Sequence, residues 1–445
     1  MKTLRRFVPD IPGMPPIFWR VAWGMTAMMA ASLIFTLYFT HLLHPRVPYY
    51  GFPWIGAGFQ FCDFHVFQER SMYFRTPKYW NKFDYPFTYP APDAVLFAMI
   101  YKLPHPLKTY LILLPLEIAG WVAWMTRGFV VRGLPALQMA AFALVIVGTS
   151  WPVYYVFDTA NIEGFMALIF ALGILAVLHD RTWLGTVLIV IAGAMKIYPL
   201  ALLALLLSKR RYKEFFAGLA LCAGIFIGSL AILGPSIAVA QAHLNVGTAF
   251  LRKNYIVLRG KDQLNFSHAL FNPLKYVVLL ADRILFHHGG HATPAHEQAL
   301  LDGSLRVYLV ATVVFGVVMY FGRLRKLPML NQVIALVVCA VVLTPFSSDY
   351  TLNNLLMPFG LLCFYTVDTW HKRRDMRPLK ICFTCFCFIF AFETFFTWKY
   401  AFASSIRALA LCVLLATVLR FPFATPEFDG PEDPENLFAH GSRPA

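Results

Sequence analysis

Charged residues are scarce in this sequence. Asp, Glu, Lys and Arg make up only 14% of its 445 residues, whereas hydrophobic residues make up 59% and the mean hydropathy is +0.61. A soluble domain cannot hide so much apolar surface, but a lipid bilayer can accept it. The composition therefore excludes an ordinary soluble protein and indicates an integral membrane protein whose surroundings include membrane lipids.

Several common functional motifs are also absent. The chain has no P-loop, no Gly-x-Gly-x-x-Gly before a helix and no internal repeat, which argues against a pump driven by ATP. The eight cysteines are uninformative, because the pair Cys382 and Cys385 lies inside an apolar run without polar neighbours. The histidine-rich segment 286–297 matches no zinc-binding spacing. We therefore expect neither a metal nor another cofactor.

Long apolar runs occupy most of the chain. Successive runs are long enough to cross the hydrocarbon core of a bilayer, which needs about 20 residues in a helix. Twelve spans are expected, near residues 18–43, 88–103, 107–126, 135–156, 161–179, 183–207, 215–239, 304–322, 329–347, 351–369, 379–398 and 402–420. Residues 266–286 are apolar enough to form a thirteenth span. The predicted fold class is an all-α polytopic membrane protein.

The basic residues indicate how the chain is oriented. The net charge of +15 suggests nucleic acid at first sight, but Lys and Arg cluster in short loops at 209–213, 323–326 and 372–380. Such clusters mark the cytoplasmic side of a membrane protein, so no nucleic-acid partner is expected. Arg127 and Arg132 fall on the outer side in this arrangement, against the rule.

This orientation divides the chain into three parts. Residues 1–17 form a cytoplasmic N-terminus, and residues 18–420 form the transmembrane domain. The two large outer loops, 44–87 and 240–265, lie on the face opposite the basic clusters. The segment 421–445 is acidic and rich in proline, and we predict a disordered cytoplasmic tail there.

One carboxylate in the first outer loop stands among aromatic residues. In a short helix over 60–74, Asp63, Phe67 and Arg70 would share one face, because they are spaced by four and three residues. An ion pair with Arg70 explains this arrangement, and so does a general base placed at the membrane surface. The residues alone leave both interpretations open.

The order of several motifs resembles a known family. The first outer loop contains "CDFHVF" and ends in "YPFTYPAP", which is similar to the type C glycosyltransferases and, more narrowly, to glycosyltransferase family 87, the polyprenyl-phosphate-mannose-dependent mannosyltransferases. The resemblance covers about residues 18–370. Its further motifs are "DTANIEGFMALIFALG" (158–173), "AGAMKIYPLALLALLL" (192–207), "DQLNFSHALF" (262–271) and "LTPFSSDYTLNNLLMP" (343–358).

The resemblance implies an inverting transfer at the outer face. A hexose such as mannose would move from a polyprenyl-phosphate donor to a hydroxyl group of a glycolipid, a polysaccharide or a protein. Asp63 matches the family's catalytic Asp and would remove the hydroxyl proton. We expect the enzyme to act as a monomer in the cytoplasmic (inner) membrane.

Further site residues follow from this chemistry. The leaving phosphate needs fixed cations, for which the candidates are Arg252, Lys253, Arg259, Lys261 and Lys196. The candidates for binding the sugar or the acceptor are Glu69, Asp84, Tyr85, Tyr89, Asn265, His268, Asp349 and Tyr350. Aromatic residues at a membrane surface also serve as anchors. A secondary transporter or flippase and a non-catalytic scaffold are the alternative functions.

Overall fold

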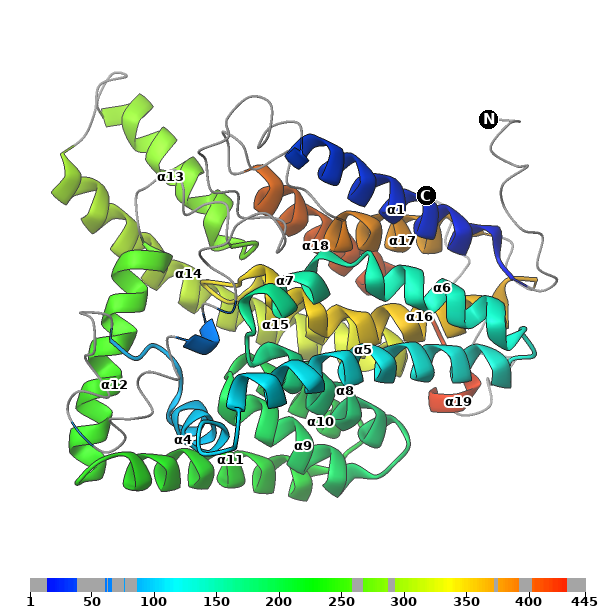
Figure 1. Cartoon of the computed structure of the whole chain (residues 1–445). Helices are drawn as coiled ribbons and strands as arrows, with labels where there is room; N and C mark the ends of the chain where they lie inside the picture. Colours follow the sequence, from blue (N-terminus) through cyan, green and yellow to red (C-terminus); the bar gives the residue numbers. More distant parts are fainter. Residues whose placement is uncertain are drawn as a thin grey trace.

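The computed structural model describes residues 14–37, 61, 63–65, 76, 86–257, 267–286, 293–371, 375–391 and 402–429. All regular elements in these ranges are helices, which agrees with the predicted all-α class (Figure 1). They are α1 (Pro16–Leu37), α4 (Ala91–Ile100), α5 (Pro106–Val131), α6 (Ala136–Gly148), α7 (Trp151–Thr159), α8 (Glu163–Leu178), α9 (Thr182–Met195), η4 (Tyr198–Leu203), α10 (Ala204–Ser208), α11 (Tyr212–Leu233), α12 (Ile237–Leu251), η5 (Arg252–Ile256), α13 (Phe271–Phe286), α14 (Pro294–Gly322), η7 (Leu324–Lys326), α15 (Met329–Val342), η8 (Asp349–Leu355), α16 (Leu356–Thr369), α17 (Arg377–Phe390), α18 (Phe402–Arg420) and α19 (Pro426–Asp429).

Several of these helices suit a bilayer. In the described part of the chain, α1, α5, α11 and α14 are long and apolar enough to cross a membrane, and α6 with α7 adds a fifth candidate span that is bent by 58°. Other apolar helices are shorter, so the predicted count of twelve spans stays a prediction. The segment proposed as a thirteenth span forms α13, whose 16 residues extend about 24 Å and pack against α14.

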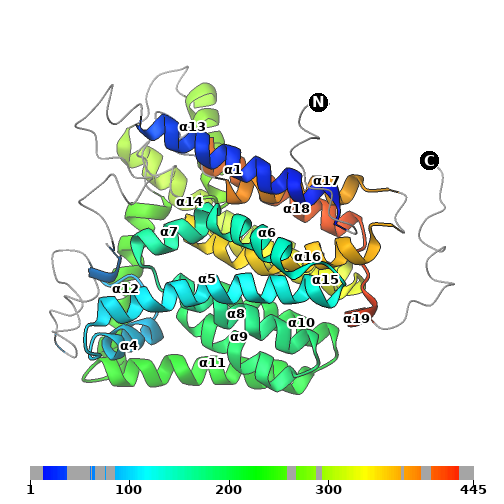
Figure 2. The ribbon, with the colours of Figure 1, turned by 45° about the vertical axis from the view of Figure 1, so that its right-hand side comes forward.

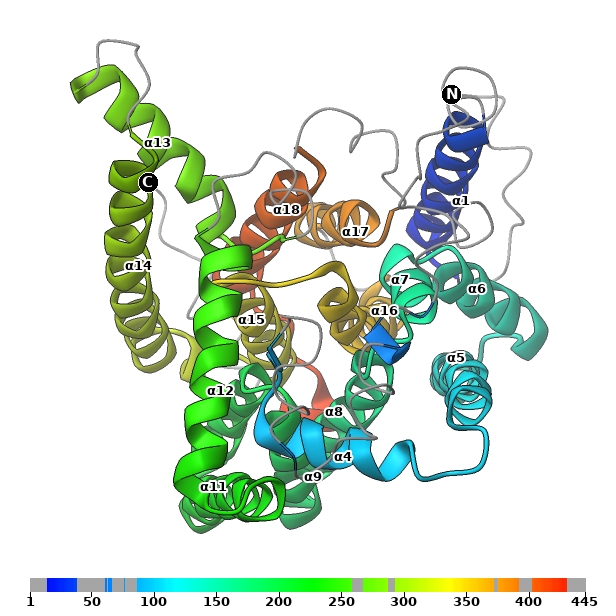
Figure 3. The ribbon, with the colours of Figure 1, turned by 60° about the vertical axis from the view of Figure 1, so that its left-hand side comes forward.

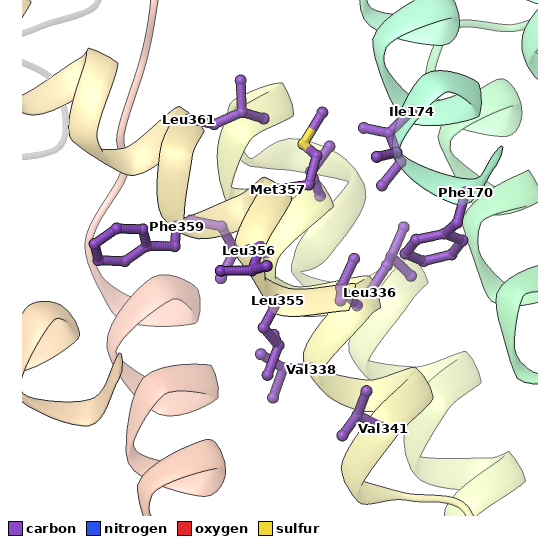
Figure 4. Close-up of a cluster of buried hydrophobic side chains, with 14 of the residues drawn as sticks. Phe170, Ile174, Leu336, Val338, Val341, Leu355, Leu356, Met357, Phe359 and Leu361 are labelled. Carbon is purple, nitrogen blue, oxygen red and sulfur yellow. The ribbon is translucent and has the colours of Figure 1, made fainter. Parts of the chain in front are cut away.

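Most of the helices lie side by side. Figures 1 and 2 show α15 and α16 between a layer containing α1, α17 and α18 and another containing α8, α9 and α11. All 14 residues of α15 are buried. Figure 4 shows how Phe170 and Ile174 of α8 approach Leu336 of α15, next to Leu355 and Met357. This central helix joins the two layers into one apolar core.

Close packing of α8 on α9 depends on small residues. A Cβ atom at Gly185 would lie 2.5 Å from the Val177 side chain and 2.9 Å from the carbonyl oxygen of Gly173. Glycine at this position lets the two backbones approach, as small residues commonly do between membrane helices. The approach aligns the beginning of α8 with the end of α9, where the polar residues described below are found.

The beginning of the predicted tail is folded. Phe423 is buried, and its backbone N–H donates to Asn331 of α15 at 2.7 Å. The Asp429 carboxylate accepts hydrogen bonds from the backbone N–H of Met329 (2.8 Å) and of Thr425 (2.9 Å). Residues 421–429, which we assigned to a disordered tail, are thus packed on α15, and residues 430–445 lie outside the described residues.

Helix ends and helix breaks meet at one end of the bundle. The predicted span 183–207 stops being α-helical at Lys196, and the predicted span 135–156 is broken before α7, which begins next to Pro152. Proline interrupts a helix because it has no N–H to donate. In Figures 1 and 3, α12 runs across this end, near α4, in the region that we predicted as the second outer loop.

Candidate active site

Asn161 is the centre of a polar cluster at this end of the bundle. Its Nδ2 donates to the Oδ2 atom of Asp63 at 2.6 Å and to the hydroxyl of Tyr89 at 3.2 Å. Its Oδ1 accepts from the backbone N–H of Glu163 at 3.0 Å and from Lys196 Nζ at 3.5 Å. One amide thus joins the predicted base, a predicted cation and a predicted aromatic residue.

The turn between α7 and α8 places this amide. α7 ends at Thr159, and Ala160 takes a left-handed conformation with φ 50°, which turns the chain. Tyr110 of α5 donates its hydroxyl to the carbonyl oxygen of Asn161, and the Asn161 side chain satisfies an N–H at the first turn of α8. Asn161 is 1% exposed, so its position is fixed from several sides.

A buried ion pair lies beside Asn161. Lys196 Nζ is 2.7 Å from the Oε2 atom of Glu163, whose side chain is completely buried. The Oε1 atom of Glu163 accepts hydrogen bonds from the hydroxyl of Tyr198 and from Asn354 Nδ2, the latter at 2.8 Å. A buried carboxylate is tolerated only when it is paired and hydrogen-bonded, and Glu163 meets both conditions.

Two aromatic rings border the Lys196 ammonium group. Its Nζ lies 4.3 Å from the ring centroid of Tyr350 and 5.3 Å from that of Tyr89. These distances suit cation–π attraction. The Tyr350 ring also stacks on Tyr155 of α7, with centroids 6.0 Å apart and planes 16° apart. The Lys196 side chain is 12% exposed, so its ammonium group is nearly enclosed.

Asp349, predicted to bind sugar or acceptor, has protein partners. It accepts a hydrogen bond from Trp151 Nε1 at 2.7 Å, pairs with Arg407 Nη1 at 2.8 Å and lies 3.6 Å from His268 Nδ1. Asp349 falls between two of the predicted spans. Burial alone would raise the pKa of this carboxyl, but Arg407, together with His268 and Trp151, outweighs burial and lowers the pKa of Asp349 to about 2. The carboxylate therefore stays ionised at neutral pH.

The second outer region holds two of the predicted cations. Arg252, in the π-helical turn η5, is bound to Asp302 of α14, with Nε 2.9 Å and Nη2 2.5 Å from Oδ1. Lys253 is exposed. The buried Lys275 of α13 donates to the carbonyl oxygen of Ile256 at 2.8 Å and so closes the same turn. Arg252 thus has a structural partner, whereas Lys253 faces the surroundings.

The described residues do not cover the whole predicted site. The residues that fall outside them are Glu69, Asp84, Tyr85, Arg259, Lys261 and Asn265, and also Arg70, the alternative partner of Asp63. Within the described ranges, no group of three His, Cys, Asp or Glu side chains is arranged to hold a metal ion.

Several members of the cluster were not among the site residues chosen from the sequence. These are Asn161, Glu163, Tyr198 and Asn354, which all contact a predicted residue or one another. The available signal was their position, because polar side chains inside apolar segments are costly and are usually functional. Asp93 carries the same signal. It is completely buried in the first turn of α4, and neither carboxylate oxygen has a hydrogen-bond partner among the residues that the structure describes.

Comparison with known proteins identifies the family. The model of glycosyltransferase family 87 matches residues 87–348, more than half of the chain. The chain belongs to glycosyltransferase family 87. Asn161, Glu163 and Lys196 lie within the matched residues, whereas Asp63 precedes them. No curated protein and no solved structure matches the chain. Membership and the apolar helices make this protein a membrane glycosyltransferase, which uses a sugar donor and an acceptor.

Proposed function

We propose that this family 87 glycosyltransferase transfers a hexose, with mannose as the first candidate, from a polyprenyl-phosphate donor to an acceptor hydroxyl with inversion. The hydroxyl belongs to a glycolipid, a polysaccharide or a protein. The observation that supports this proposal is the carboxylate of Asp63, held by Asn161 beside the ammonium group of Lys196. A base and a cation at one place are what this reaction needs.

In the proposed step, Asp63 acts on the attacking hydroxyl group and Lys196 acts on the departing phosphate. The acceptor oxygen attacks the anomeric carbon from the face opposite the phosphate, and its proton passes to Asp63. The bond between the anomeric carbon and the phosphate oxygen breaks, and its electron pair stays on the polyprenyl phosphate. Asn161 donates to one oxygen of Asp63 and so orients the carboxylate, which has further lone pairs for the incoming proton.

Lys196 is the proposed phosphate ligand among the described cations. Arg252 is bound to Asp302, whereas Lys196 lies in the same cluster as Asp63. Lys253, Arg259 and Lys261 remain proposed partners of the lipid phosphate from the second outer region. The rings of Tyr89 and Tyr350 border Lys196, and we assign them to packing against the transferred sugar. Glu69, Asp84, Tyr85 and Asn265 remain proposed acceptor ligands.

The distribution of charge supports a site on the outer face of a cytoplasmic (inner) membrane. Asn161 lies just before the first residue of α8, whereas the Asp180–Lys209 ion pair lies just beyond its other end. The basic loop 209–213 is therefore separated from the candidate site by the length of α8, about 24 Å. If basic loops face the cytoplasm, Asp63 faces outward.

The decisive experiment replaces Asp63 by Asn in the full-length protein, purified and reconstituted with polyprenyl-phosphate mannose and membrane acceptors. Asn keeps the size of the side chain but cannot accept the proton. We expect transfer to fall by about 10²–10⁴-fold, the usual contribution of a positioned general base. Donor binding and monodisperse elution should be retained.

Asp180→Asn is the matched control, because it removes a carboxylate from an exposed ion pair at the other end of the bundle. It should transfer sugar at the parent rate. If Asp63→Asn also does so, Asp63 is not the base. If Asp63→Asn instead loses stability while the remaining folded protein is fully active, its carboxylate is structural. A parent protein that moves the intact lipid-linked sugar across vesicles without transferring it would favour the flippase alternative.

A further inference from the structure

The guanidinium group of Arg407 is buried far along the chain from the predicted site. Arg407 belongs to α18, its side chain is 2% exposed, and it lies beyond the residues that the family model matches. Its Nη1 is 2.8 Å from Asp349 Oδ1, and its Nη2 donates to the carbonyl oxygen of Ala391 at 3.0 Å. Burying an ionised pair is costly and gives little net stability, so this pair calls for another explanation.

Asp349 connects Arg407 to other elements of the site. Its second oxygen accepts from Trp151, the first residue of α7, while Arg407 approaches from α18. The carboxylate is therefore fixed by groups from two helices that lie far apart in the sequence. It stands at the first position of η8, so fixing it also fixes the beginning of that turn.

Tyr350 follows Asp349 directly and reaches the candidate site. Its ring stacks on Tyr155 of α7 and lies 4.3 Å from Lys196 Nζ. Because Tyr155 and Trp151 are one turn apart on α7, the same helix contacts both Asp349 and Tyr350. Moving Asp349 would move the ring that borders the Lys196 ammonium group.

We infer that Arg407 is a positioning residue for sugar transfer: through Asp349 it holds the Tyr350 ring against Lys196, so that the donor meets an ammonium group already in place. This inference rests on the proposed function. Groups that contact only the ligands of a site often orient them, and a displacement of about 1 Å can cost 10²-fold in rate. The free-energy cost of burying the Arg407–Asp349 pair is then offset because the pair fixes the position of the Tyr350 ring.

The test is a double-mutant cycle between Arg407 and Tyr350, with transfer measured as kcat/KM for the donor per folded molecule. Arg407→Lys keeps the charge but loses the planar fork, and Tyr350→Leu removes the ring. We expect each change to lower kcat/KM by about tenfold, and the double variant to be no worse than the poorer single variant. Once the Tyr350 ring is absent, replacing Arg407 should have no further effect on kcat/KM.

Arg132→Lys is the control. Arg132 is also a mostly buried arginine paired to a carboxylate of another helix, with Nε 2.9 Å from Asp368. It follows the last residue of α5, about 33 Å along that helix from Tyr110, which contacts Asn161. It should leave donor kcat/KM unchanged. Two results would overturn the positioning role of Arg407 without affecting the proposed function. One is a double variant whose loss in kcat/KM is the product of the two single losses, and the other is an Arg407→Lys protein with the parent kcat/KM.

A second pair of variants covers loss of folding. If Arg407→Lys yields no folded protein, the neutral combination Arg407→Gln with Asp349→Asn replaces it in the cycle, because it removes both buried charges together. A parent protein that uses no polyprenyl-phosphate sugar at all would overturn the proposed function and, with it, this inference.

Discussion

Removing the ammonium group of Lys196 tests whether this cation binds phosphate or only balances a buried charge. In Lys196→Met, the carboxylate of Glu163 stays completely buried and loses its counter-ion. Tyr198 and Asn354 still donate to its Oε1 atom, so part of the solvation remains. The variant should therefore be folded but clearly less stable than the parent.

The magnitude follows from the geometry of the pair. At the observed 2.7 Å, an effective dielectric constant of about 20 gives an attraction of about 6 kcal/mol, before the cost of desolvating both groups. Breaking a buried pair by removing one partner typically costs 3–5 kcal/mol. Because the two remaining hydrogen bonds support Glu163, we expect about 3 kcal/mol in the free energy of unfolding.

A compensating change separates the two roles of Lys196. Glu163→Gln removes the carboxylate charge but keeps an acceptor for Tyr198 and Asn354. The double variant Lys196→Met with Glu163→Gln should regain most of the lost stability, because no unpaired charge remains. If Lys196 holds the donor phosphate, transfer should stay at least 10²-fold below the parent, the usual effect of losing a fixed charge at a developing anion.

The assay combines unfolding in mixed micelles with transfer of radiolabelled mannose by the reconstituted protein, normalised to the folded fraction. Stability regained without activity supports phosphate binding by Lys196. Activity that returns together with stability would refute the reasoning, because Lys196 would then only balance Glu163. In that case Lys253 and the cations at 259 and 261 become the first candidates for holding the phosphate.

Two further predictions concern the segment that carries Tyr89 and the orientation of the chain. A Cβ at Gly247 of α12 would lie 1.7 Å from the carbonyl oxygen of Phe87, so Gly247→Ala should displace the segment before α4 and lower transfer by about 10²-fold. The control is Gly316→Ala, whose Cβ meets no described atom within 4 Å and which should transfer sugar at the parent rate. Equal transfer rates for the two variants would contradict this prediction. In single-cysteine proteins on intact cells, an impermeant thiol reagent should label Cys62 but not Arg210→Cys, and labelling at 210 alone would reverse the orientation.

The sequence predicts the helical class and part of the site for identifiable reasons. Apolar runs specify helices for a bilayer, because backbone groups there must be satisfied within the segment. Asp63, Tyr89 and Lys196 were selected by chemistry and by the order of motifs, and the structure brings them to one amide. That amide, Asn161, was not selected, since its role depends on the turn after α7 and not on its neighbours in the sequence.

Pairs between distant residues could not be predicted. Arg252 was chosen as a phosphate ligand because it lies in a basic outer segment, yet Asp302, fifty residues later, binds it. Asp349 was chosen because it is a carboxylate between spans, yet Arg407 pairs with it from α18. Composition and spacing record neither contact, because both depend on how α14 and α18 pack. The number of membrane spans could not be predicted either, because helix length identifies a span only when the helix is long enough to cross the bilayer, and several apolar helices here are shorter.

The charges around Lys196 also indicate which kinetic constant it should affect. A polyprenyl-phosphate sugar is a phosphodiester with one negative charge, whereas the departing polyprenyl phosphate is a monoester that approaches two, since its second pKa is about 6. Glu163 already offsets the ammonium group in the resting site, so the donor gains little from it on binding. The attraction grows only as the bond breaks and charge develops on the phosphate. Interactions that strengthen in the transition state raise kcat. In the Lys196→Met, Glu163→Gln protein we therefore expect the loss of transfer to appear in kcat, with the donor KM nearly unchanged. A raised KM with the parent kcat would show instead that Lys196 binds the donor but does not stabilise the transition state.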